Sequence, residues 1–189
     1  VEARGGEGWC QSFADGPLNN PERPAEDVYL RCIASARDYI WLTTPYFAVE
    51  DDVVRALCMA ADSGVDVRLF LPGIWDHRYT RIVAGSHYSR LLEHGVKIYE
   101  FEPGFLHAKS FVCDGQVAMV GTVNMDYRSF QLHYECGVLL YDMPAIGDIL
   151  EDMESICRRS TPVDPEQWKK RSWLRKGLEK VLRIFSIWM

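Results

Sequence analysis

Residues 107–124 read HAKSFVCDGQVAMVGTVN. Two apolar runs, HAKSFVC and QVAMVG, flank the dipeptide Asp114-Gly115, and runs joined by an Asp-Gly link are typical of a β-hairpin. Polar side chains stand where the first run begins and just after the second run ends. The stretch therefore predicts two antiparallel strands with a cluster of reactive groups at their open end.

The open end of this hairpin has the side chains needed to handle a phosphate. On a strand, residues two apart share a face, so His107 and Lys109 should project together, and the returning strand should bring Thr122 and Asn124 beside them. A lysine charge, a hydroxyl and an amide suit phosphate oxygens, and an imidazole can attack phosphorus or move a proton near neutral pH. The cluster holds no group of carboxylates, so neither a metal nor another cofactor is expected.

Two acids near the cluster receive different predictions. Asp114 lies five residues beyond Lys109, on the opposite face, and should cap the turn through its side chain. Glu135 opens the next predicted strand, where its carboxylate could accept a hydrogen bond from a His107 nitrogen and fix the tautomer. A histidine and a lysine at a strand start are also common solvated surface residues, and the residues alone leave both interpretations open.

Outside the hairpin the sequence alternates between helical and strand patterns. Helical periodicity and end signals predict helices over 25–38, 49–64, 79–95, 144–160 and 165–189. β-Branched and apolar runs predict strands over 39–44, 65–71, 96–101, 107–113, 116–121 and 134–142. This order predicts an α/β fold, with a mixed β-sheet flanked by helices on both faces and an amphipathic helix at the C-terminus.

The composition of the whole chain narrows the possible classes. The 189 residues are 48% hydrophobic, which suffices for one sizeable core. The net charge of −6 argues against nucleic-acid binding through overall charge. Six cysteines occur without C-x-x-C spacing and signal neither a zinc site nor a redox pair. No apolar run reaches the roughly 18 residues of a membrane span.

The C-terminal tail differs from the rest of the chain. Residues 165–189 hold seven Lys or Arg and two Glu, and apolar residues recur along one helical face. This pattern predicts a basic amphipathic helix on an anionic membrane surface, although a core-packed terminal helix with a solvated basic face stays open. We therefore expect three parts: a loop-rich segment over 1–24, a catalytic domain over 25–160 and this tail over 161–189.

Two further residues are candidates for the cleft. Tyr46 follows the strand predicted over 39–44, and His77 lies in the loop after the strand over 65–71. Loops at such strand ends rim the binding crevice of α/β sheets. Rim packing of Tyr46 and solvation of His77 remain the alternatives.

The spacing His107-x-Lys109-x4-Asp114-x6-Gly121-Thr122-x-Asn124 resembles the HKD motif of the phospholipase D superfamily, with threonine where serine is usual. Glu135 falls where this superfamily places an acid that orients the histidine. Together with TPYF at 44–47 and DHR at 76–78, the chain looks like the second half of bacterial cardiolipin synthases over about 26–160.

The resemblance implies a phosphatidyl transfer that needs no metal. A histidine attacks the phosphodiester of phosphatidylglycerol, glycerol leaves, and the hydroxyl of a second phosphatidylglycerol attacks the phosphohistidine. The implied catalytic residues are His107, Lys109, Asn124 and Glu135. The implied phosphate-binding residues are Lys109, Thr122 and Asn124. The implied structural residues of the motif are Asp114 and Gly121.

The same resemblance implies partners and a location. Anionic phospholipid and a membrane surface would be the partners, at the cytoplasmic face of a bacterial membrane, and no nucleic acid is expected. The mechanism uses two histidines, whereas only His107 of the five has a lysine two residues later. The N-terminal HKD half of the same protein could complete the site, and the start at Val1 without an initiator methionine favours this. A second copy of the chain is the alternative, as in a homodimeric phospholipase D-type phosphodiesterase or nuclease. The role of His107, nucleophile or acid and base partner, stays open.

Overall fold

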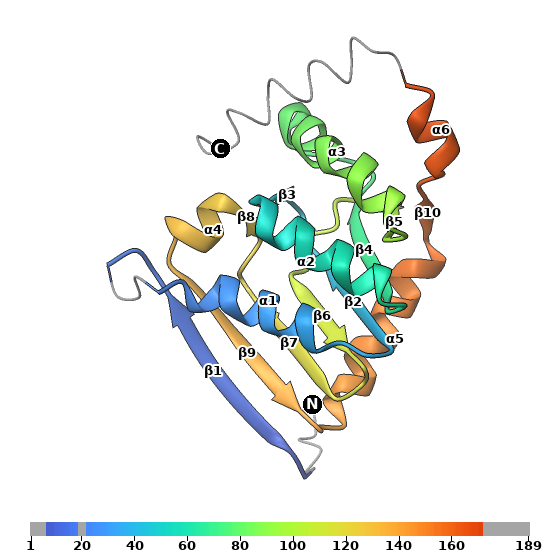
Figure 1. The fold of residues 1–189 in the computed structure, drawn as a ribbon. Helices are drawn as coiled ribbons and strands as arrows, with labels where there is room; N and C mark the ends of the chain where they lie inside the picture. Colours follow the sequence, from blue (N-terminus) through green and yellow to red (C-terminus); the bar gives the residue numbers. More distant parts are fainter. Residues whose placement is uncertain (1–6, 19–21, 172–189) are drawn as a thin grey trace.

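The computed structural model describes residues 7–18 and 22–171. Its main sheet contains β1 (Trp9–Asp15), β2 (Tyr39–Thr43), β4 (Asp66–Pro72), β5 (Lys97–Phe101), β6 (Ser110–Cys113), β7 (Val117–Gly121), β9 (Glu135–Tyr141) and β10 (Ser160–Pro162). These eight strands follow the spatial order β1-β9-β7-β6-β2-β4-β5-β10 (Figure 1). A separate parallel pair consists of β3 (Phe47–Ala48) and β8 (Met125–Asp126).

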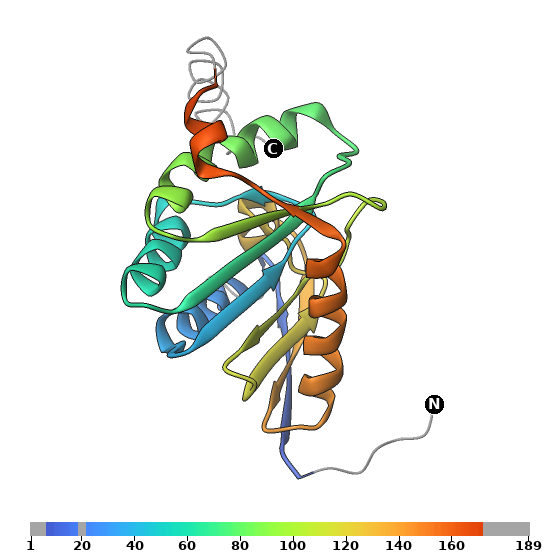
Figure 2. The ribbon, with the colours of Figure 1, turned by 90° about the vertical axis from the view of Figure 1, so that its right-hand side faces the viewer.

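Helices cover both faces of the sheet, which confirms the predicted α/β fold (Figure 2). The helices are α1 (Pro24–Ser35), α2 (Asp51–Asp62), α3 (Arg78–Glu93), α4 (Tyr127–Gln131), α5 (Ala145–Arg158) and α6 (Pro165–Lys169). The face under α1 and α2 holds the main core, where Phe111 is fully buried. The next residue, Val112, points to the other face and packs with Ile146 and Met153 of α5.

The predicted hairpin is present, with a link one residue longer than expected. Cys113 pairs with Val117, so three residues rather than two join β6 to β7. Gln116 donates its N–H to the Cys113 carbonyl at 3.0 Å. Asp114 and Gly115 have φ values of 51° and 66°, as both central residues of a type I′ turn require.

Asp114 has the structural role expected of it, through different contacts. Its carboxylate accepts the backbone N–H groups of Arg37, Asp38 and Tyr39 at 2.8–2.9 Å, so it holds the entry to β2 rather than its own turn. Burial opposes the charge, but these N–H donors outweigh it and hold the pKa of Asp114 below its usual value.

Several boundaries differ from the sequence predictions. β1 lies in the segment expected to be mostly loop, and β10 (Ser160–Pro162) crosses the predicted boundary at residue 160, so the sheet extends past both ends of the predicted domain of 25–160. β1 is an edge strand with mostly exposed side chains, and it therefore lacks the apolar alternation of a half-buried strand. The first hairpin strand begins at Ser110 and leaves His107 and Lys109 in the preceding loop. Of the predicted C-terminal helix, residues 172–189 lie outside the described part of the chain.

Strand directions bring five connecting segments to one edge of the sheet, the edge formed by strand ends rather than by an outer strand. β2 and β4 run parallel, β6 runs antiparallel to β2, and β7 and β9 each run antiparallel to the strand before them in the sheet. The segments that leave β2, β4 and β7 therefore meet the segments that enter β6 and β9. None of the helices described over 7–18 and 22–171 is long and apolar enough to cross a membrane.

Candidate active site

Four of the predicted residues line one cavity at this edge. His107 and Lys109 enter from the loop before β6, while Thr122 and Asn124 follow β7, and together they border a volume of about 740 Å³. The opposite wall comes from α5, through Asp148, Ile149 and Asp152. The hairpin thus gathers the expected groups, even though His107 and Lys109 lie in a loop rather than on a strand.

His107 is exposed and is packed mainly against aromatic rings. Its imidazole lies 5.2 Å from the ring of Phe105 and 6.5 Å from that of Tyr46, measured between centroids. Among the described residues its side chain makes no hydrogen bond. Burial lowers the pKa of His107, Lys109 lowers it further, and Asp76 opposes them. The ring is therefore biased toward the neutral form, whose lone pair can attack phosphorus or accept a proton.

Lys109 is tied to the loop that carries His107. Its ammonium donates a hydrogen bond to the His107 carbonyl oxygen at 2.8 Å. Burial lowers the pKa of Lys109, while the carboxylates of Glu135 and Asp126 raise it. The amine is thus within electrostatic reach of the His107 imidazole and of two acids.

Glu135 does not reach His107, so the predicted hydrogen bond between them is wrong within the described part of this chain. The buried carboxylate accepts the hydroxyl of Thr122 through a short contact and the hydroxyl of Ser129 at 2.9 Å. The reason is strand order. Glu135 opens β9, whose neighbour is β7, and Thr122 follows β7, whereas His107 precedes β6, one strand further away.

The same network fixes the orientation of Asn124. Ser129 has one hydroxyl proton, which it gives to Glu135, so its oxygen is left to accept the Asn124 amide N–H at 3.1 Å. The Asn124 Oδ1 atom must then point away from Ser129; it is buried and has no hydrogen-bond partner among the described residues. Thr122 likewise directs its proton to Glu135 and accepts the Cys136 N–H at 3.0 Å. In this arrangement Thr122 positions its neighbours rather than offering a donor to the cavity.

Gly121 allows the backbones of β7 and β9 to approach closely. A Cβ atom at this position would lie 2.5 Å from the Cys136 carbonyl oxygen, which is too close for any side chain. The structural role expected of Gly121 thus has a direct steric basis.

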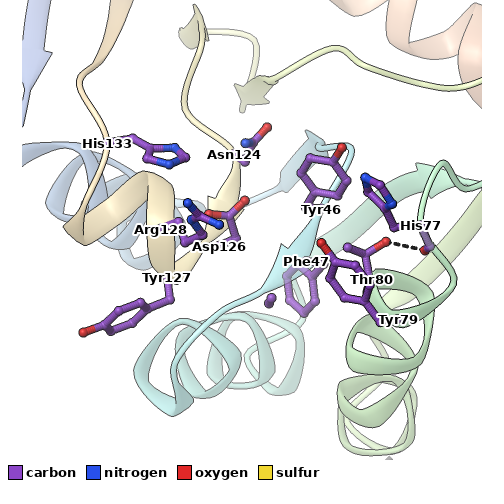
Figure 3. A pocket seen from close by; sticks show the side chains of 11 residues that line it. Tyr46, Phe47, His77, Tyr79, Thr80, Asn124, Asp126, Tyr127, Arg128 and His133 are labelled. Carbon is purple, nitrogen blue, oxygen red and sulfur yellow. Dashed lines mark hydrogen bonds between the residues drawn. The ribbon is translucent and has the colours of Figure 1, made fainter. Parts of the chain in front are cut away.

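The two predicted cleft residues are placed differently. Tyr46 neighbours His107, and its hydroxyl makes a short hydrogen bond to the Asp76 carboxylate. His77 instead stacks on Tyr79 with ring centroids 5.4 Å apart and lines a second cavity (Figure 3). Tyr46 therefore belongs to both regions, and His77 to the second alone.

Ser129 and Asp126 are positioning residues that the sequence analysis missed. Asp126 accepts the Ser129 N–H at 2.7 Å and caps α4, which places Ser129 beside Glu135. The spacing Asp126-x-x-Ser129 after a strand is a helix N-cap signal that could have located this turn. The five-residue helix α4 is too short for apolar periodicity to reveal it.

One group of carboxylates in the described residues could hold a cation. Oxygens of Glu26, Glu50 and Asp52 lie within 4.8 Å of one another at the starts of α1 and α2. Arg23 already approaches Glu26 at 3.7 Å and Glu50 at 3.8 Å, so a cation would compete with its guanidinium. Burial, followed by the charges of Asp52 and Glu50, raises the pKa of Glu26 to about 7. These residues do not line the cavity that contains His107.

A family model described as "Cardiolipin synthase, PLD-like domain" matches residues 29–157. The chain belongs to this family. The family's match covers the whole site, from Tyr46 to Glu135, and it confirms the resemblance to the phospholipase D superfamily.

Curated relatives of the cardiolipin synthase family match nearly the whole chain. Cardiolipin synthase 2 of Bacillus anthracis is 40% identical over 183 residues, which are 96% of this chain and 35% of the relative. Cardiolipin synthase of Geobacillus kaustophilus is 40% identical over 181 residues, 96% of this chain and 36% of the relative. The chain thus spans about a third of the length of the curated relatives it matches.

Solved structures show the same fold at lower identity. The phospholipase D family member Nuc from Salmonella typhimurium superposes with a TM-score of 0.70 and 21% identity, over 83% of this chain and 99% of that one. Phosphatidylserine synthase from Haemophilus influenzae gives a TM-score of 0.71 and 14% identity, over 95% of this chain and 48% of that one. At these identities the likeness supports the fold alone.

Proposed function

We propose that this domain supplies one half of the site that transfers a phosphatidyl group between two phosphatidylglycerol molecules, with release of glycerol. The observation that carries the proposal is the single cavity in which His107 meets Lys109 and Asn124. The family and its curated relatives support the substrate class, because their names refer to cardiolipin synthesis.

The proposed reaction has two steps at one phosphorus atom. A histidine nitrogen attacks and forms an N–P bond, the P–O bond to glycerol breaks, and the leaving oxygen takes a proton from a second histidine. The hydroxyl oxygen of the acceptor lipid then attacks phosphorus and the N–P bond breaks. The hydroxyl proton returns to the second histidine. His107 is one of these two histidines. The other comes from an N-terminal HKD half of the same protein or from a second copy of the chain.

Lys109 and Asn124 are proposed to bind the phosphoryl oxygens. The ammonium offsets the charge that builds up at phosphorus, and the amide N–H adds a neutral donor. Glu135, Thr122 and Ser129 act as positioning residues, because their hydrogen bonds fix the Asn124 amide before a substrate arrives.

A lipid surface at the cytoplasmic face of the membrane is the proposed setting. Exposed Ile74, Phe105 and Tyr134 lie in connecting segments at the same edge of the sheet as His107. Apolar side chains around a site can enter the headgroup region and bring a phosphodiester to the cavity. With a net charge of −6, the chain is not expected to bind nucleic acid.

The test uses the full-length gene product with phosphatidylglycerol vesicles and EDTA. The proposal predicts cardiolipin and free glycerol in equal amounts. Phosphatidic acid as the sole lipid product would indicate a hydrolase, and an absence of any phosphatidylglycerol turnover would contradict the proposal.

A homodimeric phosphodiesterase or nuclease is the second candidate, because the chain holds a single HKD motif. The fold likeness to Nuc, which extends over 99% of that chain, is compatible with it. This candidate predicts a stable dimer and phosphodiester cleavage by the 189-residue chain alone. A monomer in sedimentation, with no cleavage of lipid or DNA phosphodiesters, would remove it.

A further inference from the structure

A second cavity of about 260 Å³ adjoins the proposed active site. Figure 3 shows Arg128 and His133 on one side of it and Tyr46 and His77 on the other. Asn124 lines both cavities, and the Tyr46 ring on the wall of this one lies 6.5 Å from the His107 ring. A group bound here is therefore next to the reacting phosphate.

The polar groups of this cavity are suited to an anion. Arg128 is exposed, and within the described part of the chain its guanidinium takes part in no ion pair. His77 and His133 add two imidazoles, which already lie 3.8 Å from the carboxylates of Asp76 and Glu135. The first turn of α3 holds no acidic residue, but Asp76 just before it accepts the His77 N–H at 2.8 Å. The permanent positive charge beside this cavity is therefore that of Arg128.

One carboxylate borders the cavity and is directed elsewhere. Asp126 accepts the Ser129 N–H at 2.7 Å. Burial raises the pKa of Asp126, although the backbone N–H of Ser129 opposes that effect. Asp126 is therefore engaged within its own helical turn, and Arg128 is the lining side chain with a permanent charge.

The cavity also offers a place for carbon. Phe47 and Tyr79 supply apolar walls. An anion attached to a short carbon chain is the chemistry of a phosphoglycerol headgroup.

We propose that this second cavity binds the phosphoglycerol headgroup of the acceptor lipid, with Arg128 as the main ligand of its phosphate. The inference rests on the proposed function and adds the acceptor subsite to it. The product of that reaction carries two phosphodiesters joined by one glycerol. When the acceptor hydroxyl attacks the first phosphorus atom, the acceptor's own phosphate must lie one glycerol unit away from that atom. Arg128 lines the second cavity, which shares Asn124 with the first. Arg128 would then select a phospholipid acceptor over water.

The test compares acceptors with the full-length gene product, using phosphatidylglycerol vesicles in the presence of ethanol. Cardiolipin reports transfer to the lipid acceptor, and phosphatidylethanol reports transfer to an alcohol without a phosphate. Loss of a charge-assisted hydrogen bond to phosphate should lower the ratio of cardiolipin to phosphatidylethanol about tenfold or more in Arg128→Gln. Arg128→Lys, which keeps the charge, should recover part of the ratio. Arg78→Gln, an exposed arginine near the same edge that does not line the cavity, should leave it unchanged.

Each other outcome has a definite meaning. An equal fall of both products in Arg128→Gln, or no change in either, would overturn the acceptor subsite. A wild-type protein that forms neither product would contradict the proposed function itself. Binding of soluble glycerophosphoglycerol, followed by NMR, gives a readout independent of catalysis. Equal affinity of folded wild-type and Arg128→Gln proteins would also overturn the inference.

Discussion

The two sides of the active-site cavity differ in how much of their geometry this chain fixes. On the Asn124 side, Glu135 accepts two hydroxyl protons, and Ser129 in turn holds the Asn124 amide. On the His107 side, the imidazole is exposed and makes no side-chain hydrogen bond among the described residues. The difference shows that this fold fixes the orientation of the Asn124 amide, whereas no hydrogen bond among the described residues fixes the His107 imidazole.

This contrast predicts which substitutions lower stability as well as activity and which lower activity alone. Groups that are buried and bonded, such as Glu135, should affect both folding and activity when they are changed. A group that is exposed and unbonded, such as His107, should affect activity alone. Variants on the two sides of the cavity should therefore differ in their effects on folding and on activity.

His107→Ala should have the largest effect on activity. Removal of a nucleophile or of its proton-transfer partner lowers turnover by about 10⁴-fold or more. The free energy of unfolding should change by less than about 0.5 kcal/mol, because the imidazole makes few contacts. Cardiolipin formation and chemical denaturation of the same preparation measure the two quantities. His94→Asn is the matched control, since His94 pairs with Asp62 away from the cavity. Equal losses of cardiolipin formation in both variants would show that the effect is not specific to His107.

Glu135→Gln should lower both stability and activity. An amide cannot accept both hydroxyl protons in the same geometry, so one of Thr122 and Ser129 loses a buried acceptor, at a cost of about 1.5–3 kcal/mol. The loosened Asn124 amide should reduce turnover about 10²-fold. Glu154→Gln, which breaks only an exposed pair with Arg158 on α5, serves as the control. An unchanged unfolding midpoint in Glu135→Gln would show that the network does not form.

Asp114→Asn should lower stability with little direct effect on turnover. The carboxylate accepts three backbone N–H groups at a partly exposed position, where solvent weakens these interactions. The expected loss in the free energy of unfolding at pH 7 is therefore about 1–2 kcal/mol. Because the folded pKa of Asp114 is depressed, its contribution is fully present above the unfolded value of about 4 and is lost as the pH falls through the folded value. Unfolding measured against pH should show the wild type converging on Asp114→Asn at low pH. Exposed Asp38→Asn should show no such convergence.

Lys109→Met should lose turnover, because its ammonium is a proposed phosphate ligand, and the smallest change expected here is the accompanying rise in the pKa of His107. Burial is the main cause that lowers this pKa, and the Lys109 charge is the second, so removing the charge should raise it. Titration of the His107 ring followed by NMR measures the change directly. Lys97→Met, which removes a lysine paired with Asp66, should leave the His107 titration in place. A fall in the pKa would contradict the assigned electrostatics.

The sequence predicted the hairpin and the four cavity residues because both depend on local spacing. An Asp-Gly link sets the return of the chain, and the return sets which residues meet at the open end. The motif also placed Glu135 within the site. It could not show which side chain Glu135 touches, because that depends on β9 lying next to β7 rather than β6.

The two outer strands of the sheet, β1 and β10, were also not predicted from the sequence. β1 pairs with β9 alone and is mostly exposed, so its side chains carry little of the burial pattern that marks a strand. β10 is three residues long and is paired only with β5. In both cases a partner distant in sequence, rather than local preference, stabilises the strand.

The most direct test of the account is a rapid-quench experiment with phosphatidylglycerol labelled in its acyl chains, followed by a chase with unlabelled lipid. In the wild-type full-length product, label should attach to a histidine and pass into cardiolipin during the chase. In His107→Ala, label should never attach if His107 is the nucleophile; if His107 is the acid and base partner, label should attach more slowly than in the wild type and fail to leave. Attachment and release in His107→Ala at the wild-type rate would contradict a role for this histidine in phosphatidyl transfer.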